Sequence, residues 1–232
     1  TGAFSTVSDT ASITVSAVND APILNAGASP VLTGINEDDQ ASAGDTVSSI
    51  IVDGSITEVA LDNGAVEAIA VTGVDNTNGA WQYKIGAGAW TAINDGGLAA
   101  GHALLLDSAN LIRFVPNANY NGSPTITFVA WDKTSGVAGN YVDSAYTATG
   151  AFSTVSDTAS ITVAAVNDAP VLNAGASPVL TGINEDDQAS GGDTVASIIV
   201  DGSITEDALD NGAVEAIAVT GVDNANGEWQ YK

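Results

Sequence analysis

Apolar and polar residues alternate in short runs along this chain. Between residues 10 and 18, Ile13, Val15 and Ala17 alternate with serine and threonine. One face of such a run is apolar and the other polar, as in a half-buried β-strand. Asn19-Asp20-Ala21-Pro22 follows at once, and because Asn and Asp favour turns and Pro cannot donate to a strand ladder, the strand should end there. The same tetrapeptide recurs at 167–170.

Similar runs predict further strands along the chain. They lie at residues 50–52, 67–74, 81–85, 90–93, 104–106, 111–115 and 125–131. Asn76-Thr77-Asn78-Gly79 supplies the residues of a tight turn, which predicts that 67–74 and 81–85 form a β-hairpin. Helical periodicity is absent beyond a single turn near residues 55–61. Turn signals every eight to twelve residues or so favour an all-β sandwich.

A long internal repeat organises the chain. Residues 1–84 recur at 149–232, an offset of 148 positions, and 77 of the 84 positions are identical. We therefore expect residues 1–18 to be the last strands of a preceding repeat, 19–166 one complete β-sandwich repeat, and 167–232 the N-terminal part of the next. On this interpretation, the chain is a window cut from a longer tandem array.

The charge balance excludes some classes of partner. Lys and Arg number 4 against 28 Asp and Glu, a net charge of −24. So negative a chain should not bind the phosphate backbone of nucleic acids. No apolar run approaches the roughly 18 residues of a membrane span, so we expect no membrane insertion. The absence of Cys excludes disulfides and thiolate metal sites.

Catalytic chemistry has little support in the sequence. His102 is the only histidine, so a multi-histidine metal centre is excluded, and no local motif surrounds it with a nucleophile and an acid. The acidic residues do not fall into a recognisable glycosidase arrangement. We expect no enzymatic activity.

Several segments together resemble the tandem cadherin-like or immunoglobulin-like repeats of giant bacterial surface adhesins secreted by type I systems. The resemblance spans the whole period and rests on Ala17 to Pro22, Ile35-Asn36-Glu37-Asp38, Phe114-Val115-Pro116, Asn119-Tyr120-Asn121-Gly122 and Thr127 to Asp132. It implies an extracellular spacer at the bacterial surface, serving adhesion and biofilm formation, in which neighbouring repeats of the same chain contact one another and Ca²⁺ stiffens the joints. Calcium prefers carboxylate, amide and carbonyl oxygens, in which this chain is rich.

The resemblance also implies a set of calcium ligands. At the downstream joint they are Asn167 and Asp168 of the linker, with Glu37, Asp62 and Asp132 of the preceding repeat. Asn19 and Asp20 would serve the upstream joint, and Asp201 or Asp210 would contribute downstream. The family pattern also has an acid two residues before the Asn and an amide after the Asp. Here both places are alanine, Ala165 and Ala169, which implies fewer ions per joint.

Two other functions remain open. The first is a self-assembling extracellular filament or sheath, in which other copies of the chain pair with the exposed strand at residues 1–18 by β-augmentation. The second is a carbohydrate-binding module that uses the tryptophans and tyrosines. Aromatic residues at alternating strand positions, however, are more often part of a core.

Overall fold

The computed structural model describes residues 2–51, 54–57, 66–98, 102–142, 150–199, 203–205 and 214–232. Asp62, Asp201 and Asp210, together with part of the predicted turn at 55–61, lie outside them. None of the helices in the described ranges is long and apolar enough to cross a membrane.

The protein is all-β, as the alternating pattern predicts. Its longer strands are β5 (Ala68–Val74), β6 (Gly79–Lys84), β8 (Ala103–Asp107), β9 (Leu111–Pro116), β10 (Thr125–Trp131) and β12 (Phe152–Ser160). The two-residue strands are β1 (Ile23–Leu24), β2 (Ile35–Asn36), β3 (Asp45–Thr46), β4 (Ile56–Thr57), β7 (Thr91–Ala92), β11 (Tyr141–Val142), β13 (Val163–Ala164), β14 (Val171–Leu172) and β15 (Ile204–Thr205). The described helices are single turns: η1 (Val47–Ser49), α1 (Asp95–Leu98) and η3 (Val195–Ser197).

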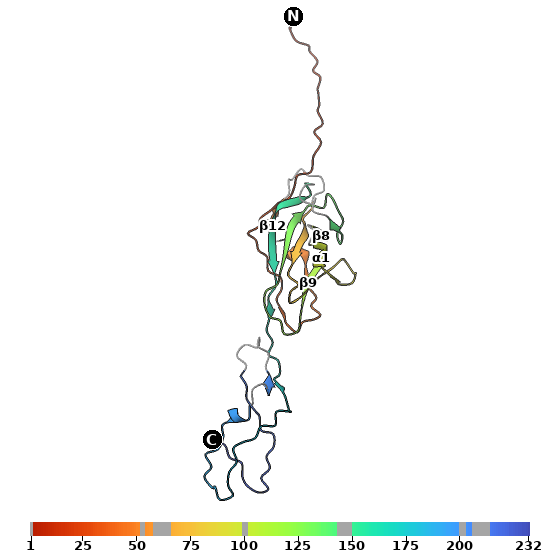
Figure 1. Ribbon diagram of the computed structural model, residues 1–232. Coiled ribbons are helices and arrows are strands. Elements are labelled where there is room, and N and C mark those ends of the chain that lie inside the picture. Colours follow the sequence, from red (N-terminus) through yellow and green to blue (C-terminus); the bar gives the residue numbers. More distant parts are fainter. Residues whose placement is uncertain are drawn as a thin grey trace.

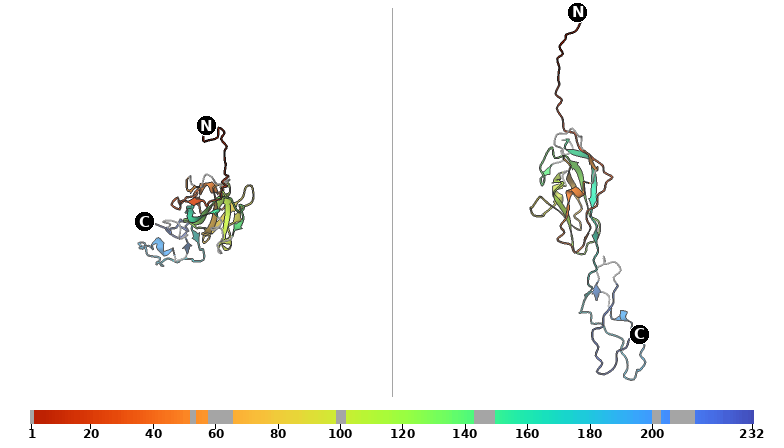
Figure 2. Two further views of the ribbon diagram at one scale, coloured as in Figure 1. Left: turned by 90° about the horizontal axis from the view of Figure 1, so that it is seen from above. Right: turned by 180° about the vertical axis from the view of Figure 1, so that it is seen from behind.

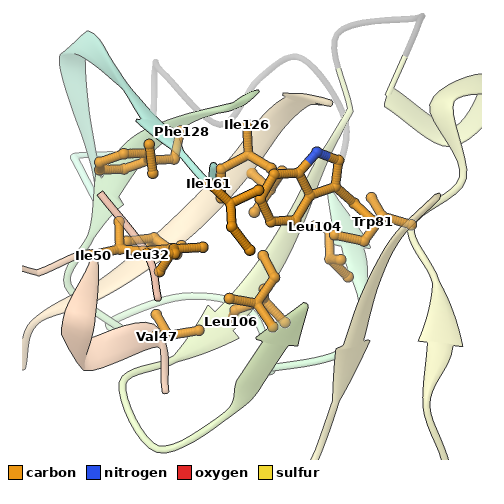
Figure 3. Packing of buried hydrophobic residues seen from close by; sticks show 14 of the residues in the cluster. Leu32, Val47, Ile50, Trp81, Leu104, Leu106, Ile126, Phe128 and Ile161 are labelled. Carbon is orange, nitrogen blue, oxygen red and sulfur yellow. The ribbon is translucent and has the colours of Figure 1, made fainter. Parts of the chain in front are cut away.

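Two antiparallel sheets share one core (Figure 1). One sheet has the order β11-β8-β5-β10-β12 and the other β3-β9-β6-β7. Ile69 and Leu104 from the first sheet join Trp81 and Phe114 from the second in one buried cluster. Figure 3 shows Trp81 packed among the labelled aliphatic side chains of this cluster. Alternate residues are buried along β9, whereas the first four residues of β5 and of β8 are all buried.

A second buried cluster lies on the opposite face of the five-stranded sheet. Leu105, Val129, Trp131 and Phe152 belong to it. The segment after β10 folds back over this face, where the Trp131 indole donates to the carbonyl of Ser135 at 2.7 Å. Both faces of the sheet are therefore covered where β10 ends, which fixes the position of the next residue, Asp132.

The predicted hairpin between residues 67–74 and 81–85 is wrong. Both segments are strands, but β5 pairs with β8 and β10, whereas β6 pairs with β7 and β9. Asn76 directs the chain from one sheet to the other. Its amide donates to the Ile93 carbonyl at 3.1 Å and its Oδ1 accepts from the Trp81 backbone N–H at 2.7 Å.

Identical sequence adopts different structure in the two copies. Phe152 is 2% exposed within β12, whereas its equivalent Phe4 is 91% exposed and has no strand around it. Val71 is 0% exposed in β5, whereas its equivalent Val219 is 70% exposed. β5 and β12 both pair with β10, whose sequence occurs once in the chain. The sequence predicted for a strand at 10–18 thus forms strands only in its second copy.

The two partial copies lie at opposite ends of the sheets. Residues 2–18 extend from one end of the body formed by residues 19–166, and residues after 166 continue from the other (Figures 1 and 2). β12 links the two ends, since Gly150, just before it, accepts a hydrogen bond from Asn19, and Val166, after β13, donates one to Glu37. Nine residues of strand span about 30 Å.

Candidate functional site

Asn19, in the upstream linker at residues 19–22, forms hydrogen bonds with residues at one end of the sheets. The Asn19 amide nitrogen donates to Asp132 Oδ2 at 2.9 Å and to the Gly150 carbonyl at 3.0 Å. These partners are 113 and 131 residues away in the chain. Asp132 is fully buried, so its hydrogen bond with the Asn19 amide is shielded from solvent. Hydrogen bonds to a charged group are stronger than those between neutral groups.

Asp132 is held rigidly in place. Its Oδ1 accepts hydrogen bonds from the Thr134 backbone N–H at 2.8 Å and the Thr134 hydroxyl at 2.7 Å. The Asp132 backbone N–H donates to the Ala151 carbonyl, and its carbonyl accepts from the Val66 N–H. Both carboxylate oxygens therefore have donors, which is how a buried charge is normally stabilised. Only the local part of this arrangement, an Asp with a Thr two residues later, has a signal in the sequence.

The structure places Asp132 at the end opposite to the one we expected. We grouped it with Glu37 at the downstream joint, but it lies beside Asn19 at the upstream end. The cause is strand direction: β10 and β12 are antiparallel and Trp131 pairs with Phe152, so β10 ends where β12 begins. Periodicity reveals β10 but does not show which end of the sheet it reaches.

The downstream linker is fastened through Glu37. Its Oε1 accepts a hydrogen bond from the Val166 backbone N–H at 2.5 Å. A parallel ladder leads to this contact, with Val163 paired to Ile35 and the Glu37 N–H donating to the Ala164 carbonyl at 3.0 Å. Glu37 lies in an acidic run that would ordinarily be a solvated loop, yet its side chain is 2% exposed.

One oxygen of Glu37 lacks a donor. Oε2 is buried and has no hydrogen-bond partner among the described residues. A buried carboxylate oxygen without a donor or cation is costly, so this atom marks a place where a donor or a cation would be stabilising. Among the predicted ligands that the structure describes, Glu37 is therefore the one whose geometry best suits a metal ligand.

The remaining predicted ligands are more open. Asn167 is exposed and its amide donates to the Asp168 carbonyl at 3.0 Å, as Asn19 does to Asp20 at 3.2 Å. Asp168 is half-buried and Asp20 is exposed. Asn167 has no counterpart of Asp132 to contact, because Asp132 lies in the part of the repeat that occurs once in the chain. The two linkers are therefore identical in sequence but differ in their contacts.

No metal site is assembled by the described residues alone, since no three acidic or histidine side chains among them converge. At the upstream end, the Asn19 amide presents nitrogen to Asp132. A cation between the two would require the amide to rotate and present its oxygen. The downstream end suits a cation better, because Glu37, whose Oε1 accepts from Val166, has a second oxygen with no hydrogen-bond donor among the described residues.

The three tryptophans of the body, all of them in the described residues, form no open binding face. Trp81 and Trp131 are buried. Trp90 is covered by the Arg113 guanidinium, 4.3 Å from the ring centroid. Arg113 in turn donates to Gln82 Oε1 and to the Ser42 carbonyl. Exposed Trp229 and Tyr231 belong to the partial second copy and correspond to Trp81 and Tyr83.

Comparison of the chain with protein-family models, curated proteins and solved structures finds no match. The residues themselves therefore supply the functional evidence.

Proposed function

We propose that this chain is a structural spacer: a tandem array of immunoglobulin-like β-sandwiches, extracellular and at a bacterial surface, that extends the binding end of an adhesin. The proposal rests on the hydrogen bonds that hold the chain at both ends of the body. The chain enters the body beside Asp132 at one end and leaves beside Glu37 at the other. Force applied along the array would therefore pass from one end of each repeat to the other, along β12.

Each joint would be held from both sides. In a continuous array, the backbone of one linker is held by Glu37 of the repeat before it, as Val166 is here. The Asn side chain of the same linker is held by the Asp132 of the repeat after it, as Asn19 is here. Adjacent linker residues thus contact different repeats, which restricts bending between them. Such a joint needs no reaction, and we propose no catalytic residue.

Bound calcium would stabilise this joint further. Glu37 supplies a buried oxygen without a donor, and Asn167 and Asp168 follow within the same linker. A bound Ca²⁺ would neutralise the carboxylates of the joint and tie the linker to the preceding repeat through oxygen ligands. Because the chain has a net charge of −24, little cationic side-chain charge competes for these acids.

Calcium binding tests the proposal. A chain of two complete repeats is obtained by following residue 232 with the sequence of residues 85–166, which completes the second copy. Titration calorimetry should detect Ca²⁺ binding that is lost in Glu37→Gln, which keeps the size of the side chain and removes its charge. Asp38→Asn is the matched control, since Asp38 is exposed. Equal binding by the two variants would contradict a role for Glu37.

A further inference from the structure

The first and last segments of the body run side by side in the same direction. Residues 29–37 follow the upstream linker, and residues 157–166 precede the downstream one. Val163 pairs with Ile35 in a parallel strand pair. Further backbone hydrogen bonds run from Ser160 to Pro30, Leu32 to Ser160, Ile35 to Thr162 and Glu37 to Ala164. We call this pairing the terminal ladder, and all of its residues belong to the body.

A buried carboxylate holds each end of the terminal ladder. At the upstream end, Asp157 is 6% exposed and its Oδ2 accepts a hydrogen bond from the Ser29 backbone N–H at 2.9 Å. At the downstream end, Glu37 is 2% exposed and its Oε1 accepts from the Val166 backbone N–H. Each segment therefore contributes one carboxylate that bonds to the backbone of the other. Hydrogen bonds to a charged acceptor are stronger than those between neutral groups.

Tension between the two linkers would pull these segments in opposite directions. Residues 29–37 are loaded from the upstream end, where Asn19 lies, and residues 157–166 from the downstream end, beyond Val166 (Figures 1 and 2). Because the segments are parallel, such a load runs along both of them and shears one past the other. The hydrogen bonds between them are then stretched together. A load applied to both segments at one end would instead break the same bonds one after another.

The last segment is also held on its other side. β12 pairs with β10 from Ser160 back to Ser156, so sliding of residues 157–166 would disrupt this antiparallel pairing as well. Residues 38–156 lie between the two segments in sequence. While the terminal ladder holds, tension passes across it and does not stretch the chain of residues 38–156.

We propose that the terminal ladder is a mechanical clamp, the element that keeps each repeat folded when the protein is under tension. Unfolding under force is governed by the rate of unfolding and so by the contacts that must break first. In this protein those are the hydrogen bonds of the terminal ladder. The proposal rests on the spacer function for the source of the tension, but the clamp itself requires no calcium.

Single-molecule force spectroscopy on the full chain tests the clamp by pulling it in two directions. The chain contains no Cys, so a pair of introduced cysteines defines where the force is applied. Ala17→Cys with Ala169→Cys loads the terminal ladder in shear. Asp38→Cys with Ala169→Cys loads it from the downstream end alone. All three positions are exposed and lie outside the ladder. Unfolding of the body is recognised by the length of chain released, about 3.6 Å per residue.

We expect the unfolding force in shear to be several times the force for loading from the downstream end, both measured with chelator present. Equal forces in the two directions would overturn the proposal. That result would leave calcium-dependent stiffening of the joint intact. Conversely, a joint that calcium does not stiffen would leave the difference between the two forces intact, so the two proposals fail separately.

A proline substitution tests which bonds supply the resistance. Ser160→Pro removes the N–H that donates to Pro30, and because this N–H points away from β10, the pairing of β12 with β10 is retained. Ser156→Pro is the matched control. It lies four residues earlier on β12, so by strand alternation its N–H points to the same side, but it lies outside the terminal ladder.

Ser160→Pro should lower the shear force much more than Ser156→Pro and bring it close to the force for downstream loading. Circular dichroism shows whether each variant folds. Equal losses of shear force in two folded variants would contradict the clamp. If Ser160→Pro does not fold, the comparison of the two pulling directions in the otherwise unchanged chain decides the question.

Discussion

The side-chain amide of Asn19 donates to the buried carboxylate of Asp132, 2.9 Å away, across 113 residues of sequence. The contact joins a linker to the end of a core strand. Its sequence equivalent in the second linker, Asn167, is exposed. A substitution at Asn167 can therefore serve as an internal control for the same substitution at Asn19.

Replacing Asn19 by Ala should destabilise the body by about 1–3 kcal/mol, because the Asp132 carboxylate then loses a donor while buried. Chemical unfolding followed by tryptophan fluorescence measures the change. Asn167→Ala should shift the free energy of unfolding by less than about 0.5 kcal/mol, as expected for an exposed side chain. Equal effects of the two substitutions would show that the Asn19–Asp132 contact contributes nothing.

Val71→Ala should cost about 2 kcal/mol, since it removes buried methyl groups from a closed core and leaves a cavity. The same substitution at Val219, which is exposed, should be nearly neutral. The midpoint of urea unfolding distinguishes the two variants. A large effect at Val219 would mean that residues 214–232 pack more tightly than the structure shows.

Gly79→Ala should destabilise the body by about 1–3 kcal/mol through overpacking. A Cβ atom at Gly79 would overlap the Phe114 ring and approach the Val115 carbonyl too closely. The corresponding Gly227 has open space around it, so Gly227→Ala should not destabilise the chain. Thermal melting of the two variants provides the comparison, and an unchanged melting temperature for Gly79→Ala would be inconsistent with the packing of β6 on β9.

High pH should weaken the fold through Tyr83. Burial, with a smaller effect from nearby Tyr141, raises the pKa of Tyr83 above its ordinary value of 10.0. The unfolded chain therefore loses this proton first, and the stability due to neutral Tyr83 is complete below pH 10 and is lost as pH rises through the folded-state pKa. Unfolding free energies measured from pH 9 to about 12 should fall less in Tyr83→Phe than in the wild type. Tyr231→Phe, at a fully exposed position, should follow the wild-type curve.

The sequence predicts most strands but not their partners. β8, β9 and β10 lie where apolar runs in the sequence predict strands. Burial alternates along β9, whereas Ala103 to Leu106 of β8 are all buried because both faces of their sheet are covered. Two predicted strands do not form. Residues 10–18 are in no strand, and residues 50–51 form a turn after η1, where Ile50 is buried. The β5–β6 hairpin prediction fails because the side chain of Asn76 bonds across to Ile93, a distant contact that no local pattern encodes.

The candidate site could be predicted only in part, for the same reason. The resemblance to adhesin repeats implies Glu37 and Asn19 as site residues. In the structure Glu37 contacts Val166 and Asn19 contacts Asp132. The end to which Asp132 belongs depends on the direction of β10 relative to β12. The buried state of Glu37 depends on the parallel pairing of β2 with β13, which joins segments 128 residues apart and has no signal in either segment.

Small-angle X-ray scattering on the two-repeat chain, with calcium and then with chelator, tests the spacer proposal most directly. We predict that calcium lengthens and straightens the particle, and that Glu37→Gln abolishes this change while Asp38→Asn retains it. A scattering profile that is the same with calcium and with chelator would contradict a calcium-stiffened joint.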